Sequence, residues 1–70
     1  MPIRKLGETV RELREGRGLT QGQLAELAQI ALSYVTTIEA GQPGSPPRQI
    51  LERLARALGV TSKKLLDPDG

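Results

Sequence analysis

The stretch IALSYVTTIEAG, residues 30–41, decides the fold of this 70-residue chain. Its centre holds four β-branched residues in a row, at positions 35–38. Such side chains are stiff at χ1 and on propensity alone favour a strand. The rest of the chain offers no other convincing strand, and a lone strand has nothing with which to pair. We therefore predict that residues 31–40 form a helix and that Gly41 ends it.

This predicted helix has two different faces. Val35 and Ile38 are three residues apart and lie on one side, together with Ala31. The opposite side is expected to be exposed, and it carries Leu32, Ser33, Thr36 and Thr37. Because the helix is short and rich in poor helix formers, packing against the rest of the domain must hold it.

Two helices are predicted before this segment. The first has an apolar stripe at helical spacing and ends at two glycines: Leu6, Val10 and Leu13, then Gly16 and Gly18. The second is predicted over residues 20–28. Thr20 is a suitable N-cap for it, and Gln23 stands at the position that completes a capping box.

Two more helices are predicted after a loop rich in proline and glycine, residues 41–47. Pro47 suits the first position of a helix whose apolar stripe runs from Ile50 to Leu58 and which Gly59 ends. Thr61 is expected to cap a last short helix over residues 62–66, whose two leucines can fold back onto the core. The sequence therefore predicts one all-α domain of five helices over residues 1–66, with residues 67–70 as a tail or the start of a linker.

Composition excludes several classes of protein. The chain has no cysteine and no histidine, which effectively excludes a zinc site, and it has no phosphate-binding glycine loop. We expect no enzyme activity, no cofactor and no metal. No apolar run approaches the roughly 20 residues that span a bilayer, and the N-terminus lacks the apolar segment of a secretory signal. We expect a soluble cytoplasmic domain.

The charge is unevenly distributed. Residues 1–18 carry five basic and three acidic groups, as do residues 48–70, so that each flank has a net charge of +2. Residues 19–47 contain no Lys or Arg and have a net charge of −2. A solvated surface of mixed charge explains this pattern, and so do two basic flanks on either side of a neutral central unit.

Three strings, in this order and at these spacings, carry a family resemblance: LRELREGRGLTQGQLAELA, SYVTTIEAG and LERLARALGV followed by LL. Together they resemble the Cro and lambda-repressor-like (XRE-type) helix-turn-helix family over residues 3–66. The resemblance implies a compact five-helix domain in which helices 20–28 and 31–40 form the helix-turn-helix. It also implies that helix 31–40 lies in the DNA major groove.

The resemblance implies roles for individual residues. The expected base contacts are Leu32, Ser33, Thr36 and Thr37. The expected phosphate contacts are Gln21, Tyr34, Gln42, Ser45 and Arg48, with Arg11 and Arg17 as general electrostatic surface. Arg14 and Glu39 match a pair that bridges the first helix to the end of the recognition helix. The expected dimer contact lies around the last helix, with Val60, Thr61, Leu65 and Leu66.

The chain departs from the family pattern at the turn. Gln29 stands where the family usually has a glycine and where a left-handed residue is expected, and Ala31 stands where Ser or Thr usually caps the recognition helix. The resemblance implies a sequence-specific transcriptional regulator, expected to be a repressor, that binds a pseudo-palindromic double-stranded operator as a homodimer. The centre of the chain, which lacks Lys and Arg, favours an alternative: a protein-interaction module of the same fold, such as a coactivator domain or the cytoplasmic domain of a cell-shape protein.

Overall fold

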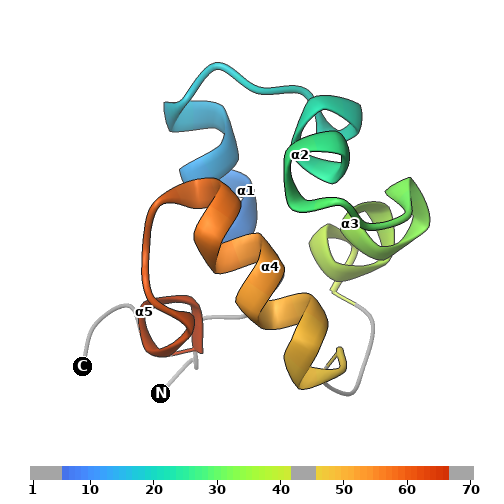
Figure 1. Cartoon of the computed structure of the whole chain (residues 1–70). Helices are drawn as coiled ribbons and strands as arrows, with labels where there is room; N and C mark the ends of the chain where they lie inside the picture. The colour runs from blue at the N-terminus through green and yellow to red at the C-terminus, as the bar shows by residue number, and fades with distance from the viewer. Residues whose placement is uncertain (1–5, 42–45, 67–70) are drawn as a thin grey trace.

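A computed structural model describes residues 6–41 and 46–66, and all its regular elements in these ranges are helices (Figure 1). They are, in chain order, α1 Leu6–Gly16, α2 Gln21–Ala28, α3 Leu32–Glu39, α4 Arg48–Leu58 and α5 Ser62–Leu66. The predicted all-α fold of five helices is confirmed. The β-branched stretch is helical, as its lack of a strand partner indicates. The predicted tail, residues 67–70, lies outside the described residues.

The predicted helix ends are largely confirmed. Thr20 Oγ1 accepts from the Gln23 N–H at 3.0 Å, and Gln23 Oε1 accepts from the Thr20 N–H at 2.9 Å, which completes the capping box at the start of α2. Gly18 and Gly59 have φ of 70° and 73° and end α1 and α4 in left-handed conformations. Pro47 was expected to be the first helical residue of α4. It is the N-cap instead, because its ψ of 148° is extended.

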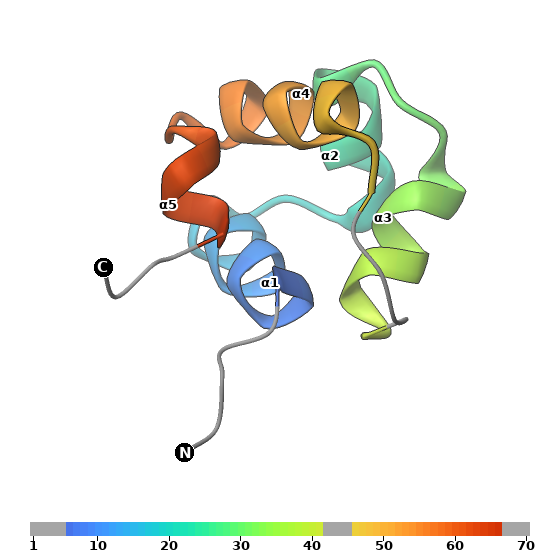
Figure 2. The same cartoon turned by 90° about the horizontal axis from the view of Figure 1, so that it is seen from below.

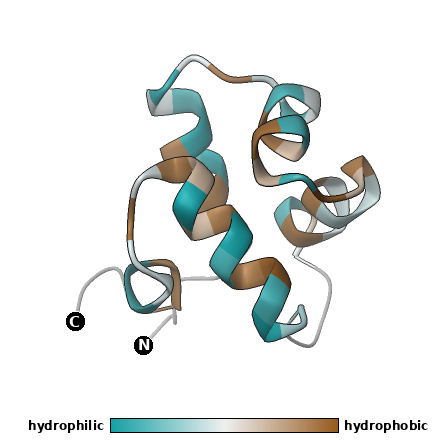
Figure 3. Cartoon of the chain, in the orientation of Figure 1, coloured by the Kyte–Doolittle hydropathy of each residue, from teal (hydrophilic) through white to brown (hydrophobic). Residues whose placement is uncertain are grey.

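Each helix packs against at least two others. α2 lies on α3 and α4, α1 lies on α3 and α5, and α4 also lies on α5 (Figures 1 and 2). Apolar and polar positions alternate along the helices, as Figure 3 shows most clearly for α4. The largest side chains that are completely buried come from all five helices: Val10, Leu24, Val35, Leu54, Leu58 and Leu65.

The faces of α3 follow the prediction with one exception. Val35 and Ile38 are buried. Ala31, expected on the same buried face, is exposed, because it precedes the helix and has an extended backbone with φ −67° and ψ 142°. The helical spacing that would place it beside Val35 does not reach back to a residue outside the helix.

Gly7 lets α1 approach the C-terminal end of α3 very closely. A Cβ added at this position would overlap the carbonyl oxygen of Ile38 and would lie 3.0 Å from the Cα of Glu39. The obstacle is backbone, so α1 can cross α3 at this distance only if residue 7 has no side chain. The local sequence pattern gives no sign of this role for Gly7.

Candidate nucleic-acid interface

One face of α3 is open to solvent. Leu32 is 49% exposed, and Ser33, Thr36 and Thr37 are also exposed, while the opposite face is in the core. The structure therefore brings the four predicted base-contact residues together. Thr36 Oγ1 donates to the carbonyl oxygen of Ser33 at 3.0 Å. With its proton used inside the helix, Thr36 presents a methyl group and an accepting oxygen to the outside.

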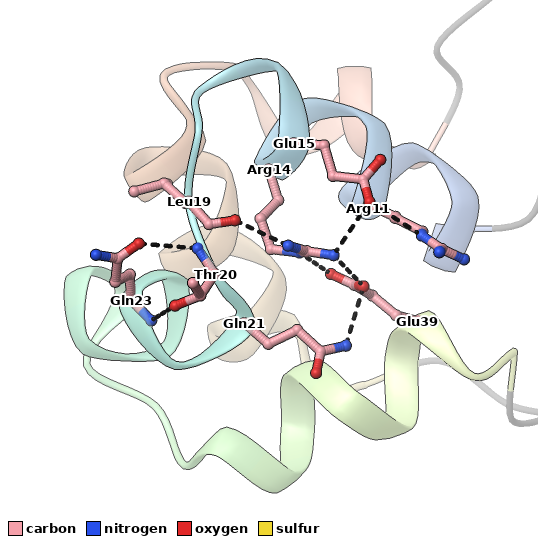
Figure 4. A network of polar contacts seen from close by, with 8 residues as sticks. All are labelled: Arg11, Arg14, Glu15, Leu19, Thr20, Gln21, Gln23 and Glu39. Carbon is pink, nitrogen blue, oxygen red and sulfur yellow. Dashed lines mark hydrogen bonds and ion pairs between the residues drawn. The ribbon is translucent and has the colours of Figure 1, made fainter.

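The C-terminal end of α3 is held by a nearly buried ion pair (Figure 4). Arg14 donates from Nε to Glu39 Oε2 at 2.7 Å and from Nη2 to Glu39 Oε1 at 3.0 Å, and the two side chains are 11% and 5% exposed. Arg14 Nη1 also donates to the carbonyl oxygen of Leu19 at 2.8 Å. The predicted Arg14–Glu39 pair is confirmed. The hydrogen bond to Glu39 raises the pKa of Arg14 despite the opposing effect of burial.

Gln21 is part of the same network. Its Nε2 donates to Glu39 Oε1 at 3.1 Å, so that Glu39 receives three hydrogen bonds from α1 and α2 (Figure 4). The family resemblance implies a phosphate contact for Gln21. One of its two amide N–H groups is directed at Glu39 here, which leaves the second N–H and the position of Gln21 at the start of α2 as its means of meeting a phosphate.

The turn between α2 and α3 has the predicted left-handed residue. Gln29 has φ 58° and ψ 46° and is the only residue other than glycine with a positive φ in the described part of the chain. This conformation costs about 1–2 kcal/mol for a residue with a Cβ. The N–H of Gln29 donates to the carbonyl of Glu26 at 3.2 Å and that of Ile30 to the carbonyl of Ala25 at 3.0 Å, which is the Schellman pattern.

A side chain from α4 also reaches this turn. Arg53 Nη1 donates to the carbonyl oxygen of Gln29 at 2.9 Å. The structure also confirms that α3 lacks a side-chain cap at its start. Ala31 makes no side-chain hydrogen bond there, and the loss of such a cap costs about 1 kcal/mol. The local sequence pattern does not indicate this role for Arg53, because its partner is a backbone atom 24 positions away.

Two of the predicted phosphate-binding arginines are on the surface in weak pairs. Arg48, whose side chain is 90% exposed, lies 3.2 Å from Glu52, and Arg11 lies 3.4 Å from Glu15. Exposed pairs of this kind contribute only about 0–1 kcal/mol, so a phosphate can replace the carboxylate at little cost. Tyr34 is also exposed. Two further candidates, Gln42 and Ser45, lie outside the described residues.

Arg17 is placed differently. Its guanidinium occupies the space that a Cβ on Gly59 would fill, at the C-terminal end of α4. Arg48 begins α4, and the 11 residues of this helix correspond to about 16 Å. The structure therefore does not bring Arg17 together with Arg48. A cation at the C-terminal end of a helix is favoured by the helix dipole.

The four residues predicted at a dimer contact are not equally available. Leu66 is 54% exposed and Thr61 is exposed, while Val60 is half-buried and packs against the core. Leu65 is a correction: it is completely buried among the helices of its own chain, so its side chain has no surface to offer a partner. Adjacent residues of a helix point about 100° apart, and here Leu65 faces inward and Leu66 outward.

No group of acidic side chains in residues 6–41 and 46–66 is arranged to hold a metal ion. In the same ranges, no helix has the length and apolar character needed to cross a membrane.

The sequence profile of a family described as a helix-turn-helix domain matches residues 5–67. This chain belongs to that helix-turn-helix family. The domain superposes on the N-terminal DNA-binding domain of SinR from Bacillus subtilis with a TM-score of 0.84 at 34% identity, covering 89% of this chain and 90% of that one. It also superposes on the restriction-modification controller protein C.AhdI from Aeromonas hydrophila with a TM-score of 0.76 at 37% identity, covering 86% and 89% of the two chains.

The curated relatives of this helix-turn-helix domain are longer. The HTH-type transcriptional regulator DdrOP3 of Deinococcus deserti is 40% identical over 63 residues, which are 90% of this chain and 48% of the relative. The regulator SinR of B. subtilis is 34% identical over 62 residues, which are 89% of this chain and 56% of the relative. The chain thus spans about half the length of these relatives. They are named as regulators, not enzymes, in agreement with the sequence.

Proposed function

We propose that this helix-turn-helix domain binds double-stranded DNA in a sequence-specific manner, with α3 in the major groove, and acts in a transcriptional regulator, most simply a repressor. The observation that carries the proposal is the exposed face of α3, which combines an apolar side chain and three hydroxyl-bearing ones on a helix whose other face is fixed in the core. A helix of this kind is what a major groove admits.

The chemistry of this face sets the kind of readout. Leu32 and the methyl groups of Thr36 and Thr37 suit the methyl group of thymine, and the hydroxyls of Ser33 and Thr37 can donate to or accept from base edges. None of the four makes the two-pronged contact of Arg, Asn or Gln, which is worth about 1–3 kcal/mol per base. Specificity should therefore rest partly on DNA shape and on the spacing of two half-sites.

Phosphate binding would use exposed basic side chains of the neighbouring helices. Arg48, at the start of α4, and Arg11, on α1, have exposed side chains that can leave their surface pairs. α2 and α3 themselves have no Lys or Arg. Because each neutralised phosphate contributes about −0.9 to the slope of log K against log salt, the slope per subunit should be shallow.

We further propose that two copies bind a pseudo-palindromic operator, with Leu66 and Thr61 at the contact between them. Two-fold symmetry would place the α3 helices about 34 Å apart, in successive major grooves. Residues 1–66 would form the DNA-binding unit, and such a regulator would work where the nucleoid is, in the cytoplasm.

Selection from a random duplex pool, followed by titration at several salt concentrations, tests the proposal. We expect an enriched motif, a preference that changes in Thr37→Ala, and an affinity that falls about equally for all sequences in Arg48→Ala, with a salt slope smaller by about 1. No enriched motif, with a Kd no better than about 10⁻⁵ M near physiological salt, would refute specific DNA binding.

The lack of Lys and Arg in the centre of the chain favours one other function. Leu27 on α2 and Leu32 on α3 are large, exposed and apolar, and no basic residue lies on either helix. Such a surface also suits a protein-interaction module, in which DNA would not be the partner. The pool selection separates the two functions, because an interaction module would enrich no sequence.

A further inference from the structure

The two ends of α3 are anchored in different ways. At the C-terminal end, Glu39 accepts three hydrogen bonds from α1 and α2. At the N-terminal end, Ala31 provides no side-chain cap. The direction in which α3 leaves the turn therefore depends on the backbone of residues 29–31, because these are the only residues between α2 and α3.

Arg53, a side chain from outside the helix-turn-helix, donates to this turn through the 2.9 Å hydrogen bond from its Nη1 to the carbonyl oxygen of Gln29. Two physical effects favour this contact. The carbonyl belongs to the C-terminal end of α2, where the helix dipole attracts a cation. Gln29 is also the strained residue of the turn, so a contact that fixes its carbonyl restricts the backbone torsions that aim α3.

The contact is also well placed to act on the interface. α4, which carries Arg53, packs on α2 and α5, so the guanidinium joins the turn to a helix outside the helix-turn-helix. Leu32 and Ser33, two of the proposed base-contact residues, begin α3 only three and four positions after Gln29. A change in the torsions of Gln29 would displace these two side chains before those further along α3.

We propose that Arg53 is a positioning residue for the recognition helix: its hydrogen bond to Gln29 holds the turn so that Leu32 and Ser33 meet the bases in one orientation. This inference rests on the proposed DNA-binding function. This role differs from that of a phosphate contact, because Arg53 acts through the protein backbone. Its removal should therefore lower the affinity for the selected DNA sequence more than the affinity for other DNA sequences.

Arg53→Ala and Arg56→Ala form a matched pair, because both remove one exposed arginine of α4 and the same charge. Fluorescence anisotropy would measure their binding to the duplex that the wild-type chain selects from a random pool and to a scrambled duplex. We expect Arg53→Ala to weaken binding to the selected duplex about three- to tenfold more than Arg56→Ala does, a coupling of ordinary size for residues in contact. The scrambled duplex and the salt slope should not distinguish the two variants.

The same pair in a Gln29→Gly background tests the route of the effect. Glycine widens the range of torsions open to residue 29 and keeps the carbonyl that accepts from Arg53, so the turn should depend on the tether at least as much. The difference between Arg53→Ala and Arg56→Ala on the selected duplex should therefore persist or grow there. A smaller difference there, or equal weakening on the scrambled duplex with a salt slope reduced by about 1, would overturn the proposal, and the second result would make Arg53 a phosphate contact.

A measurement without DNA separates this inference from the proposed function. Amide hydrogen exchange reports the opening of the turn through the N–H of Ile30, which donates to Ala25. Arg53→Ala should accelerate that exchange severalfold and Arg56→Ala should not. If the wild-type chain selects no duplex, the proposed function fails and this exchange still decides whether the tether exists. Equal exchange in the two variants would overturn the tether itself.

Discussion

Replacing Gly7 with alanine should destabilise the domain strongly, because α1 approaches α3 at this residue. The added Cβ would overlap the Ile38 carbonyl oxygen and lie 3.0 Å from Glu39 Cα and 3.1 Å from the Ile38 carbonyl carbon. All three atoms are backbone, so no flexible side chain can move out of the way. Overpacking usually costs about 1–3 kcal/mol, and we expect about 2–3 kcal/mol here.

This cost is large for a domain of 70 residues, whose free energy of unfolding should be about 4–10 kcal/mol at the usual ~0.05–0.15 kcal/mol per residue. At about 4–8 °C per kcal/mol, the melting temperature should fall by about 10–20 °C. A shift of the C-terminal end of α3, which carries Glu39, would relieve part of the steric overlap with the added Cβ. The variant should therefore also lose affinity for its selected duplex.

Gly16→Ala is the matched control. Gly16 ends the same helix, and a Cβ added there meets no atom within 4 Å. Both substitutions gain a similar benefit in helix propensity, at most about 0.5–1 kcal/mol. Urea denaturation followed by circular dichroism measures both, with equal m-values as the sign that only stability has changed. A difference between the two variants below about 0.5 kcal/mol, the range of an ordinary surface change, would refute the close approach.

Three further substitutions test the contacts that shape the helix-turn-helix. Glu39→Gln removes the charge that Arg14 binds through two hydrogen bonds and should lower the free energy of unfolding by about 2–4 kcal/mol in urea denaturation. If the effects of Glu39→Gln and Arg14→Met simply add in the double variant, the two residues are not coupled. Gln29→Gly removes the left-handed strain and should raise the free energy of unfolding by about 1 kcal/mol, measured as a higher melting temperature; an unchanged or lower value would mean that the surroundings already absorb the strain. Thr20→Ala breaks the capping box and should cost about 1 kcal/mol on the same scale, whereas no loss would mean that water replaces the cap.

Local pattern was sufficient to predict the helices. The spacing of Val35 and Ile38 indicated which face of α3 is buried, and Thr20 with Gln23 marked the start of α2 to within one residue. The same pattern failed where a residue leaves the helix: Ala31 and Pro47 both have extended backbones and serve as caps. Periodicity applies to residues inside a helix and does not locate its first residue.

The contacts between helices were beyond local reasoning. Arg14 and Glu39 were paired only through the family resemblance, since 25 positions separate them. Nothing in the sequence distinguishes Gly7, which allows a backbone approach, from Gly16, which meets nothing. Similarly, the pair of leucines at the end of α5 gives no local sign of which side chain is buried. These facts depend on how helices cross, which the sequence specifies only through packing of the whole core.

The residues that hold α3 in place do not lie on its exposed face. Eight residues rich in β-branched side chains, with no N-terminal side-chain cap, would not form a stable helix alone. The burial of Val35 and Ile38 and the bonds of Glu39 to α1 and α2 hold it in place, and none of these uses Leu32 or Thr37. Substitutions at Leu32 and Thr37 are therefore free to alter the surface offered to DNA with little effect on the fold. A domain built in this way can change its preferred sequence without paying for it in stability.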